Sequence, residues 1–260
     1  MPYHYLQVER DEGIALLTVN RPETLNAVDI HVLAEISQVF TELENDSTVK
    51  VILITGAGNK AFIAGGDVAS MSRMSIPEAR HFVYEGQRVL LNIERASKVT
   101  IAAINGYALG GGTELALACD IRVASDTAQL GLPETSLGLL PGWGGTQRLS
   151  RLVGPGISKE LIFTARRIKA EEALRIGLVN RIVPGDTLLV EAKQLAQLIL
   201  KNSPIAIQQA KLSINQGLQT SIDQGLVIEA EAWLTLFGTH DRKEGTTAFV
   251  EKRKPEFTGE

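Results

Sequence analysis

The first two thirds of the chain switch repeatedly between the hydrophobic periods of strands and of helices. Residues 30–43 carry apolar side chains at helical spacing, which predicts an amphipathic helix with one buried face. Residues 49–55 are apolar and largely β-branched, which predicts a buried strand. The same criteria predict strands at 5–9, 14–19, 99–104 and 121–124, a helix at 77–94, and a glycine-rich loop at 56–67. Strands that alternate with helices indicate the α/β class.

The last third of the chain has a different pattern, which is almost wholly helical. Helices are predicted at 147–152, 157–164, 170–176, 188–201, 204–216, 221–237 and 242–253, with one short strand at 179–183. The change from the α/β pattern falls near residues 190–200, and we divide the chain into residues 1–195 and 196–260. Because the terminal helices carry apolar faces, they must cover either their own core or a neighbouring subunit.

Composition excludes several classes of function. The chain has 260 residues, with 26 basic and 30 acidic side chains and a net charge of −4, so we expect neither nucleic-acid binding nor charge-driven membrane binding. Cys119 is the single cysteine and is expected to be a plain core residue, so no internal disulfide can form and a reducing compartment fits. The four histidines are scattered, and we expect no metal site.

The N-terminal residues and the lengths of the apolar runs bear on where in the cell the protein is located. The N-terminus lacks the long apolar segment of a signal peptide, and no window approaches 18 uninterrupted apolar residues. We therefore expect a cytoplasmic protein, or an organellar protein whose presequence is absent from this sequence.

Residues 101–120 carry the most informative candidate chemistry. They predict a buried strand, a turn with glycines at 110–112, and a helix with Glu114 in its first turn. Glycines let a ligand approach the backbone closely, and the unpaired N–H groups of a helix start can bind a developing oxyanion. The purely structural interpretation is a tight strand-to-helix turn.

Two further stretches could complete such a site. Gly65 and Gly66 precede Asp67 and could offer another N–H to the same oxygen, although a turn capped by Asp67 would explain the pattern equally well. Glu134 lies in apolar surroundings that would raise its pKa for acid–base work, or it is a surface glutamate that caps the next segment. Neither glycine stretch has the pattern of a P-loop or a dinucleotide-binding turn. Together the three stretches indicate an enzyme that stabilises an enolate.

Several separated motifs also occur in the order of one known family. The 101–120 stretch resembles the signature of the enoyl-CoA hydratase (crotonase) superfamily, and the resemblance continues through 21–27, 61–67, 134–145 and 248–253. It implies an α/β crotonase-like spiral of ββα repeats with a C-terminal helical region. By this resemblance, residues 1–195 form the core with the acyl-CoA site. Residues 196–260 serve trimerisation and cover the site.

The resemblance also assigns residues. It implies that the backbone N–H groups of Gly66 and Gly111 hold the thioester oxygen, that Glu114 activates water, and that Glu134 exchanges the proton at Cα. Two glutamates at these places are typical of the short-chain hydratase branch. The substrate and coenzyme A contacts it implies are Ala27, Ala64, Asp67, Val68, Gly142, Trp143 and Lys252. Trp143 stands where many relatives have a small residue, so it could reshape the acyl pocket.

The resulting prediction is a reversible enoyl-CoA hydratase. It adds water syn to trans-2-enoyl-CoA and gives 3-hydroxyacyl-CoA, with no metal or redox cofactor. The expected partners are an acyl-CoA thioester and further copies of the chain, as a trimer or a dimer of trimers. The alternatives are a hydratase of a cyclic or branched enoyl-CoA, an enoyl-CoA isomerase, and a non-enzymatic acyl-CoA or RNA binder. A serine peptidase of the same fold lacks support, because no Gly-x-Ser-x-Gly motif occurs.

Overall fold

Two sheets form the centre of the protein in a computed structural model that describes residues 3–260. The larger sheet has six strands in the order β1-β2-β3-β5-β7-β10. Its strands are β1 (Leu6–Asp11), β2 (Ile14–Val19), β3 (Val51–Gly56), β5 (Val99–Ile104), β7 (Ile121–Ser125) and β10 (Arg181–Val183). Strands β1 and β2, both predicted from the sequence, form an antiparallel hairpin, and all other neighbours in this sheet are parallel.

The smaller sheet has four short strands in the order β4-β6-β8-β9. They are β4 (Ala61–Ile63), β6 (Tyr107–Leu109), β8 (Gln129–Gly131) and β9 (Ile168–Lys169). Each of β3, β5 and β7 in the large sheet is followed by a strand of the small sheet and then by helical structure. The predicted α/β class and its spiral of ββα repeats are therefore confirmed.

The short strands correct two sequence predictions. The predicted loop at 56–67 contains β4, and the predicted turn before the helix at Gly111 contains β6. A strand of three residues is too short to show a period of two. Its backbone groups pair with partners distant in sequence, as Ala61 does with Tyr107.

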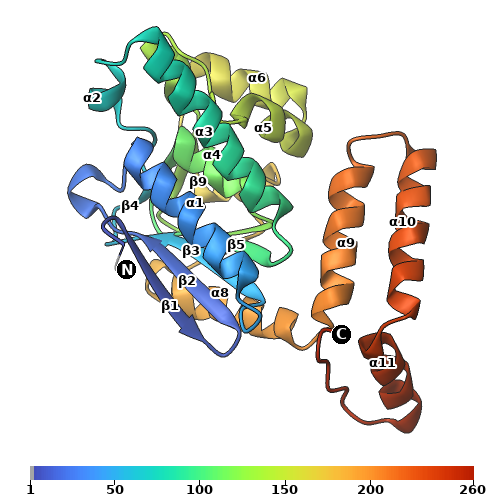
Figure 1. The fold of residues 1–260 in the computed structure, drawn as a ribbon. Coiled ribbons are helices and arrows are strands. Elements are labelled where there is room, and N and C mark those ends of the chain that lie inside the picture. The colour runs from blue at the N-terminus through green and yellow to red at the C-terminus, as the bar shows by residue number, and fades with distance from the viewer. Residues whose placement is uncertain (1–2) are drawn as a thin grey trace.

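Helices cover both faces of the large sheet. The helices α1 (Ile30–Asn45) and α3 (Ile76–Arg95) lie against one face (Figure 1), and α1 buries the predicted apolar stripe from Val32 to Leu43. Asp29 begins α1, since its Oδ1 accepts hydrogen bonds from the N–H groups of His31 and Val32. The opposite face packs on α8 (Leu188–Leu200) through side chains such as Leu53, Ile101 and Ala192.

The remaining short elements connect these layers. They are η1 (Pro22–Thr24), α2 (Val68–Met71), α4 (Gly111–Ala118), η2 (Pro133–Leu137), α5 (Gly145–Val153), α6 (Pro155–Thr164), α7 (Ala170–Arg175) and η3 (Gly185–Thr187). Cys119 follows α4 and is buried, which raises the pKa of its thiol to about 12 and agrees with the predicted core role. Within residues 3–260, no helix is long and apolar enough to span a membrane.

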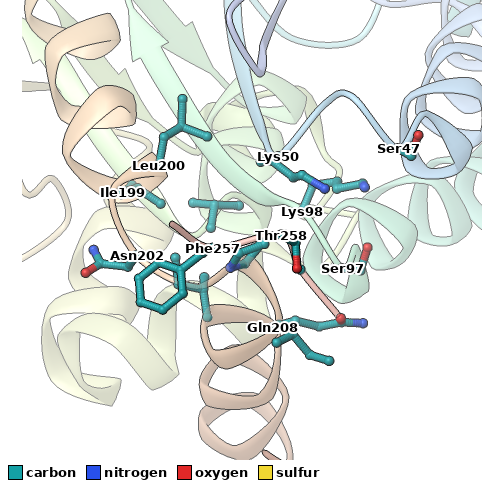
Figure 2. A pocket seen from close by; sticks show the side chains of 15 residues that line it. Ser47, Lys50, Ser97, Lys98, Ile199, Leu200, Asn202, Gln208, Phe257 and Thr258 are labelled. Carbon is teal, nitrogen blue, oxygen red and sulfur yellow. The ribbon is translucent and has the colours of Figure 1, made fainter. Parts of the chain in front are cut away.

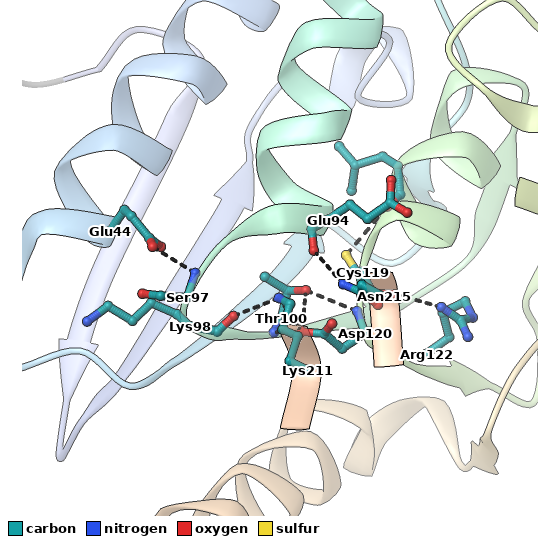
Figure 3. Close-up of polar contacts among 11 residues, drawn as sticks. Glu44, Glu94, Ser97, Lys98, Thr100, Cys119, Asp120, Arg122, Lys211 and Asn215 are labelled. Atoms are coloured by element: carbon teal, nitrogen blue, oxygen red, sulfur yellow. Dashed lines mark hydrogen bonds and ion pairs between the residues drawn. The ribbon is translucent and has the colours of Figure 1, made fainter. Parts of the chain in front are cut away.

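Residues 204–260 form a C-terminal arm beside this core. Helices α9 (Pro204–Gly217) and α10 (Ile222–Phe237) pair as a hairpin, and α11 (His240–Glu251) lies at its base (Figure 1). Polar contacts join α9 to the core (Figure 3): Lys211 Nζ lies 2.8 Å from Asp120 Oδ2 and donates to Lys98 O. The division of the chain at residues 195 and 196 stays a proposal; α8 packs on the sheet before the arm begins.

The end of the chain returns to the junction between core and arm. A cavity of about 300 Å³ lies there (Figure 2), with Lys50 and Lys98 on the core side and Phe257 and Thr258 from the tail. Buried Asp241 fastens the tail, because its Oδ1 accepts a hydrogen bond from the N–H of Thr258 at 2.8 Å.

Candidate active site

A second cavity of about 300 Å³ contains the four residues predicted to perform the chemistry. Gly66, Gly111, Glu114 and Glu134 all line it. Its remaining lining is largely apolar: Met71, Met74, Ala79, Phe82, Val83, Leu139, Leu140, Gly142 and Trp143. Segments that are distant in sequence therefore meet at one site, with the polar groups on an apolar background typical of ligand pockets.

Gly66 is placed by a single parallel bridge to Val28. The N–H of Val28 donates to Gly65 O at 2.9 Å, and the N–H of Asp67 donates to Val28 O at 3.0 Å. In such a bridge the residues on either side of Gly66 make the hydrogen bonds, so its own N–H is left for a ligand. Gly65 enables the turn because its φ of +105° is in the left-handed region that only glycine adopts readily.

Gly111 is the first residue of α4, so its N–H has no acceptor within the helix. The preceding Gly110 has a φ of +51° and lies against Glu134, whose Oε1 would be 2.8 Å from a Cβ atom at Gly110. A Cβ at Gly112 would come within 2.0 Å of Ile63 O, so α4 begins in direct backbone contact with β4. The glycine run thus positions the helix start, as the sequence predicted, and brings it against β4.

Glu114 is a buried carboxylate that also anchors a loop. It is 2% exposed, and its Oε1 accepts hydrogen bonds from the N–H groups of Trp143 and Gly145, both at 2.7 Å. Burial raises the pKa of Glu114 to about 7; the hydrogen bond from Gly145 opposes this shift and the charge of Glu134 adds to it. Both bonds end on Oε1, which leaves Oε2 to exchange a proton.

Glu134 reaches the same cavity from the first turn of η2. Pro133 begins this 3-10 helix, and Gly138 ends it with a φ of +73°. Its Oε2 is buried without a hydrogen-bond partner among the described residues, and burial raises the pKa of Glu134 to about 7. A surface cap, the structural alternative for this residue, is not what the structure shows.

This arrangement can stabilise an anion and move protons at one place. Two backbone N–H groups lie at a largely apolar cavity, where such donors act strongly on a developing oxyanion. Two carboxyl groups with pKa values near 7 can each give or take a proton at neutral pH. Among residues 3–260, no three His, Cys, Asp or Glu side chains gather closely enough to hold a metal ion.

The predicted coenzyme A contacts occupy two separate regions. One region holds Ala64, Asp67 and Val68, which are close in sequence to the cavity residue Gly66, together with Ala27. The N–H of Ala64 donates a hydrogen bond to Leu25 O, which joins the segment around Ala27 to the segment around Gly66. Asp67 also caps α2, since its Oδ1 accepts from the N–H of Ser70 at 3.1 Å. Lys252 is exposed at the end of α11 in the C-terminal arm and does not line the cavity, so the chain does not bring it to the site.

Gly142 and Trp143, which the family resemblance implies as substrate contacts, both line the cavity. Sequence reasoning missed Phe82 and Val83 on α3 and Leu139 and Leu140 after η2. Nothing in their local pattern distinguishes a pocket wall from an ordinary core or surface position. Gly86, on the same helix as Phe82 and Val83, was a sequence signal that another segment packs closely against α3. A glycine in a helix interior costs about 1 kcal/mol relative to alanine, so its presence needs a packing reason.

The comparisons with known proteins agree with this geometry. A family model described as enoyl-CoA hydratase/isomerase matches residues 9–260. A short-chain-enoyl-CoA hydratase of Clostridium acetobutylicum is 50% identical over 96% of this chain and 95% of its own length. A crotonyl-CoA hydratase of Syntrophomonas wolfei is 48% identical over 99% of both chains.

A solved structure extends the agreement to three dimensions. The crystal structure of an enoyl-CoA hydratase from Bacillus anthracis superposes with a TM-score of 0.96 at 42% identity, over 99% of this chain and 100% of the other. The match in sequence and in fold covers both sheets, the cavity and the arm. The chain therefore belongs to the enoyl-CoA hydratase/isomerase family, as its sequence motifs predicted.

Proposed function

We propose that this protein adds water reversibly to trans-2-enoyl-CoA thioesters and forms 3-hydroxyacyl-CoA. The observation that carries the proposal is that buried Glu114 and partly buried Glu134 line one cavity with Gly66 and Gly111, whose backbone N–H groups are without an acceptor among residues 3–260. The sequence prediction of an enzyme of the enoyl-CoA hydratase class agrees with the family match and with both named relatives.

The environments of the two glutamates favour different roles. Glu114 accepts two backbone hydrogen bonds, which stabilise its ionised form. Glu134 has a buried oxygen without a hydrogen-bond partner among residues 3–260, which favours its neutral form. We therefore propose Glu114 as the base toward water and Glu134 as the acid toward Cα, while the protons of such a coupled pair belong to both groups.

The reaction follows from these roles. Glu114 takes a proton from water as the water oxygen forms its bond to Cβ, and the electron pair of the C=C bond moves toward the thioester carbonyl. The N–H groups of Gly66 and Gly111 bind the enolate oxygen, and each such donor contributes about 10²–10³ in rate. Glu134 then gives its proton to Cα from the same face. Exchange of protons with solvent restores the pair.

This chemistry requires no metal or redox cofactor, because the thioester carbonyl accepts the electrons and backbone donors hold the charge. The substrate brings coenzyme A, for which we retain Ala27, Ala64, Asp67 and Val68 as contacts beside Gly66. Because Lys252 lies in the arm and does not line the cavity, we retain it as a contact to the nucleotide phosphates only where it comes from another copy of the chain. The single cysteine supports the proposed cytoplasmic location.

Self-association is proposed from the surface of the arm, and the family resemblance makes a homotrimer or a dimer of trimers the expected assembly. Large apolar side chains are exposed along it: Leu218 at 75%, Ile222 at 75%, Trp233 at 58% and Phe249 at 85%. Large apolar side chains exposed on one segment are typical of a surface that binds another protein chain. Sedimentation of the purified protein tests this, and a monomer at micromolar concentration would contradict it.

The activity is tested by mixing the purified protein with crotonyl-CoA and following the absorbance of the conjugated thioester. We expect a rapid fall that Glu114→Gln and Glu134→Gln each slow by about 10²–10⁴, the range for a positioned acid or base. Glu9→Gln, the same chemical change at an exposed site on β1, should keep the wild-type rate. Wild-type turnover in either cavity variant would remove that glutamate from the mechanism.

A further inference from the structure

Trp143 borders both the reaction cavity and a second, larger space. The second space is a groove of about 1070 Å³ between the core and the arm, lined by Leu91 of α3, Arg148 of α5 and Leu212 of α9, among others. We call it the core–arm groove. Within residues 3–260, Trp143 is the one residue that lines both the cavity and this groove.

The indole of Trp143 fills a slot between two glycines. A Cβ atom at Gly86 of α3 would lie 2.1 Å from Trp143 Nε1, and one at Gly111 would lie 2.4 Å from Trp143 Cζ3. The ring of Phe82 packs on the indole edge-on at 5.1 Å between centroids. Trp143 is 5% exposed. The slot exists only because both neighbours lack a side chain, so the ring spans from α3 to the start of α4.

The backbone around Trp143 is fixed from several directions. Its N–H donates to Glu114 Oε1 at 2.7 Å, and its carbonyl accepts from Arg148 Nη1 at 2.8 Å. Gln87 Nε2 donates to the carbonyl of Gly142 at 2.8 Å. Arg148 is itself held by Glu94 at 2.7 Å. A ring attached to so restrained a backbone acts as a fixed wall.

We infer that Trp143 closes the acyl end of the cavity and restricts the enzyme to short enoyl chains. The inference rests on the proposed function, which places the thioester carbonyl at Gly66 and Gly111. Since the indole lies on Gly111, it stands close to the reacting carbons, and a longer chain would have to cross it to reach the core–arm groove. A cavity of about 300 Å³ that must hold the thioester and the acyl group is small for a ligand pocket.

The test is a length series of trans-2-enoyl-CoA substrates with four, six, eight and ten acyl carbons. For the wild-type protein, kcat/KM should fall steeply beyond the four-carbon substrate. In Trp143→Ala the ratio of the eight-carbon to the four-carbon kcat/KM should rise at least tenfold, because each methylene that gains a buried place is worth about fourfold. Trp143→Phe should give an intermediate ratio.

Two further variants separate a wall from a general loosening of the site. Leu91→Ala changes the core–arm groove but not the slot, so it should keep the wild-type ratio. Gly86→Leu added to Trp143→Ala refills the slot from α3 and should lower the ratio again. A ratio in Trp143→Ala equal to that of the wild type, or a wild-type protein that hydrates eight carbons as well as four, would overturn the inference.

Binding distinguishes this inference from the proposed reaction. Butyryl-CoA and octanoyl-CoA cannot be hydrated, and the wild-type protein should bind butyryl-CoA at least tenfold more tightly. If the protein binds butyryl-CoA more tightly than octanoyl-CoA but hydrates no enoyl-CoA, the proposed function is refuted while the role of Trp143 as a wall stands. Equal affinities would refute the wall even if crotonyl-CoA is hydrated. Where Trp143→Ala does not fold, this comparison in the wild type and in Trp143→Phe decides.

Discussion

The substitution Glu134→Gln should make the protein more stable at alkaline pH. Burial raises the pKa of Glu134 from 4.5 to about 7, and its Oε2 has no hydrogen-bond partner among the described residues. The folded state therefore holds this proton more tightly than the unfolded chain does. Between pH 4.5 and 7 the folded state binds more protons, so its stability falls as the pH rises through this window.

The magnitude follows from the difference between the two pKa values. Each pKa unit corresponds to 1.36 kcal/mol, so ionised Glu134 lowers the free energy of unfolding by up to about 3 kcal/mol above pH 8. Glutamine cannot ionise and removes this pH-dependent contribution. The increase in the free energy of unfolding of Glu134→Gln is smaller where the N–H groups of the new amide find no hydrogen-bond acceptor.

Urea unfolding followed by circular dichroism at pH 5 and pH 8.5 measures the effect, at one protein concentration because the chain is proposed to assemble. The stability of Glu134→Gln minus that of the wild type should grow by about 2–3 kcal/mol from pH 5 to pH 8.5. Glu9→Gln, on the exposed face of β1, should show no such growth. Parallel pH dependences for Glu134→Gln and the wild type would refute the assignment of a raised pKa to Glu134.

Three further predictions concern the backbone and the arm. Gly66→Ala should keep hydration of crotonyl-CoA within about threefold of the wild-type rate. The new Cβ meets Met71 Sδ at an ordinary contact distance of 3.5 Å, and the N–H donor remains. A loss of rate above tenfold would contradict this. The matched change Gly65→Ala forces alanine to a φ of +105° and should cost about 1–3 kcal/mol in a thermal melt, and an unchanged melting temperature would count against the strained turn. Lys211→Met removes the cationic partner of the half-buried Asp120 carboxylate and leaves it only the hydrogen bonds from Thr100, so α9 should detach more readily and limited proteolysis near Asn202 should accelerate several-fold. Cleavage at the wild-type rate would show that apolar packing alone holds the arm.

Local sequence patterns were sufficient wherever neighbours along the chain set the structure. The apolar stripe of α1 follows from its helical spacing, and Asp29 begins the helix because its side chain accepts hydrogen bonds from the nearby N–H groups of His31 and Val32. The start of α4 follows from glycine conformations and from Glu114 in the first turn. The family could also be predicted, because its motifs are continuous segments in a fixed order.

The small sheet and the environments that set the pKa values of the two glutamates could not be predicted in this way. Strands β4 and β6 exist because backbone groups distant in sequence pair with each other. The raised pKa of Glu114 arises from burial and from Glu134, and its opposing hydrogen bonds come from a loop about 30 residues later.

The sequence by itself determined the class of fold, the helix starts and the residue types available for chemistry, since these depend on periodicity and on local backbone conformation. The family resemblance already implied that Gly66 and Gly111 act together with Glu114 and Glu134, but only the tertiary structure decided the shape of the cavity that they line and the burial of each glutamate. It also decided that Trp143 fits between Gly86 and Gly111. Burial, pKa and the shape of a cavity depend on which distant segments exclude water from one another, and no short window of sequence records that.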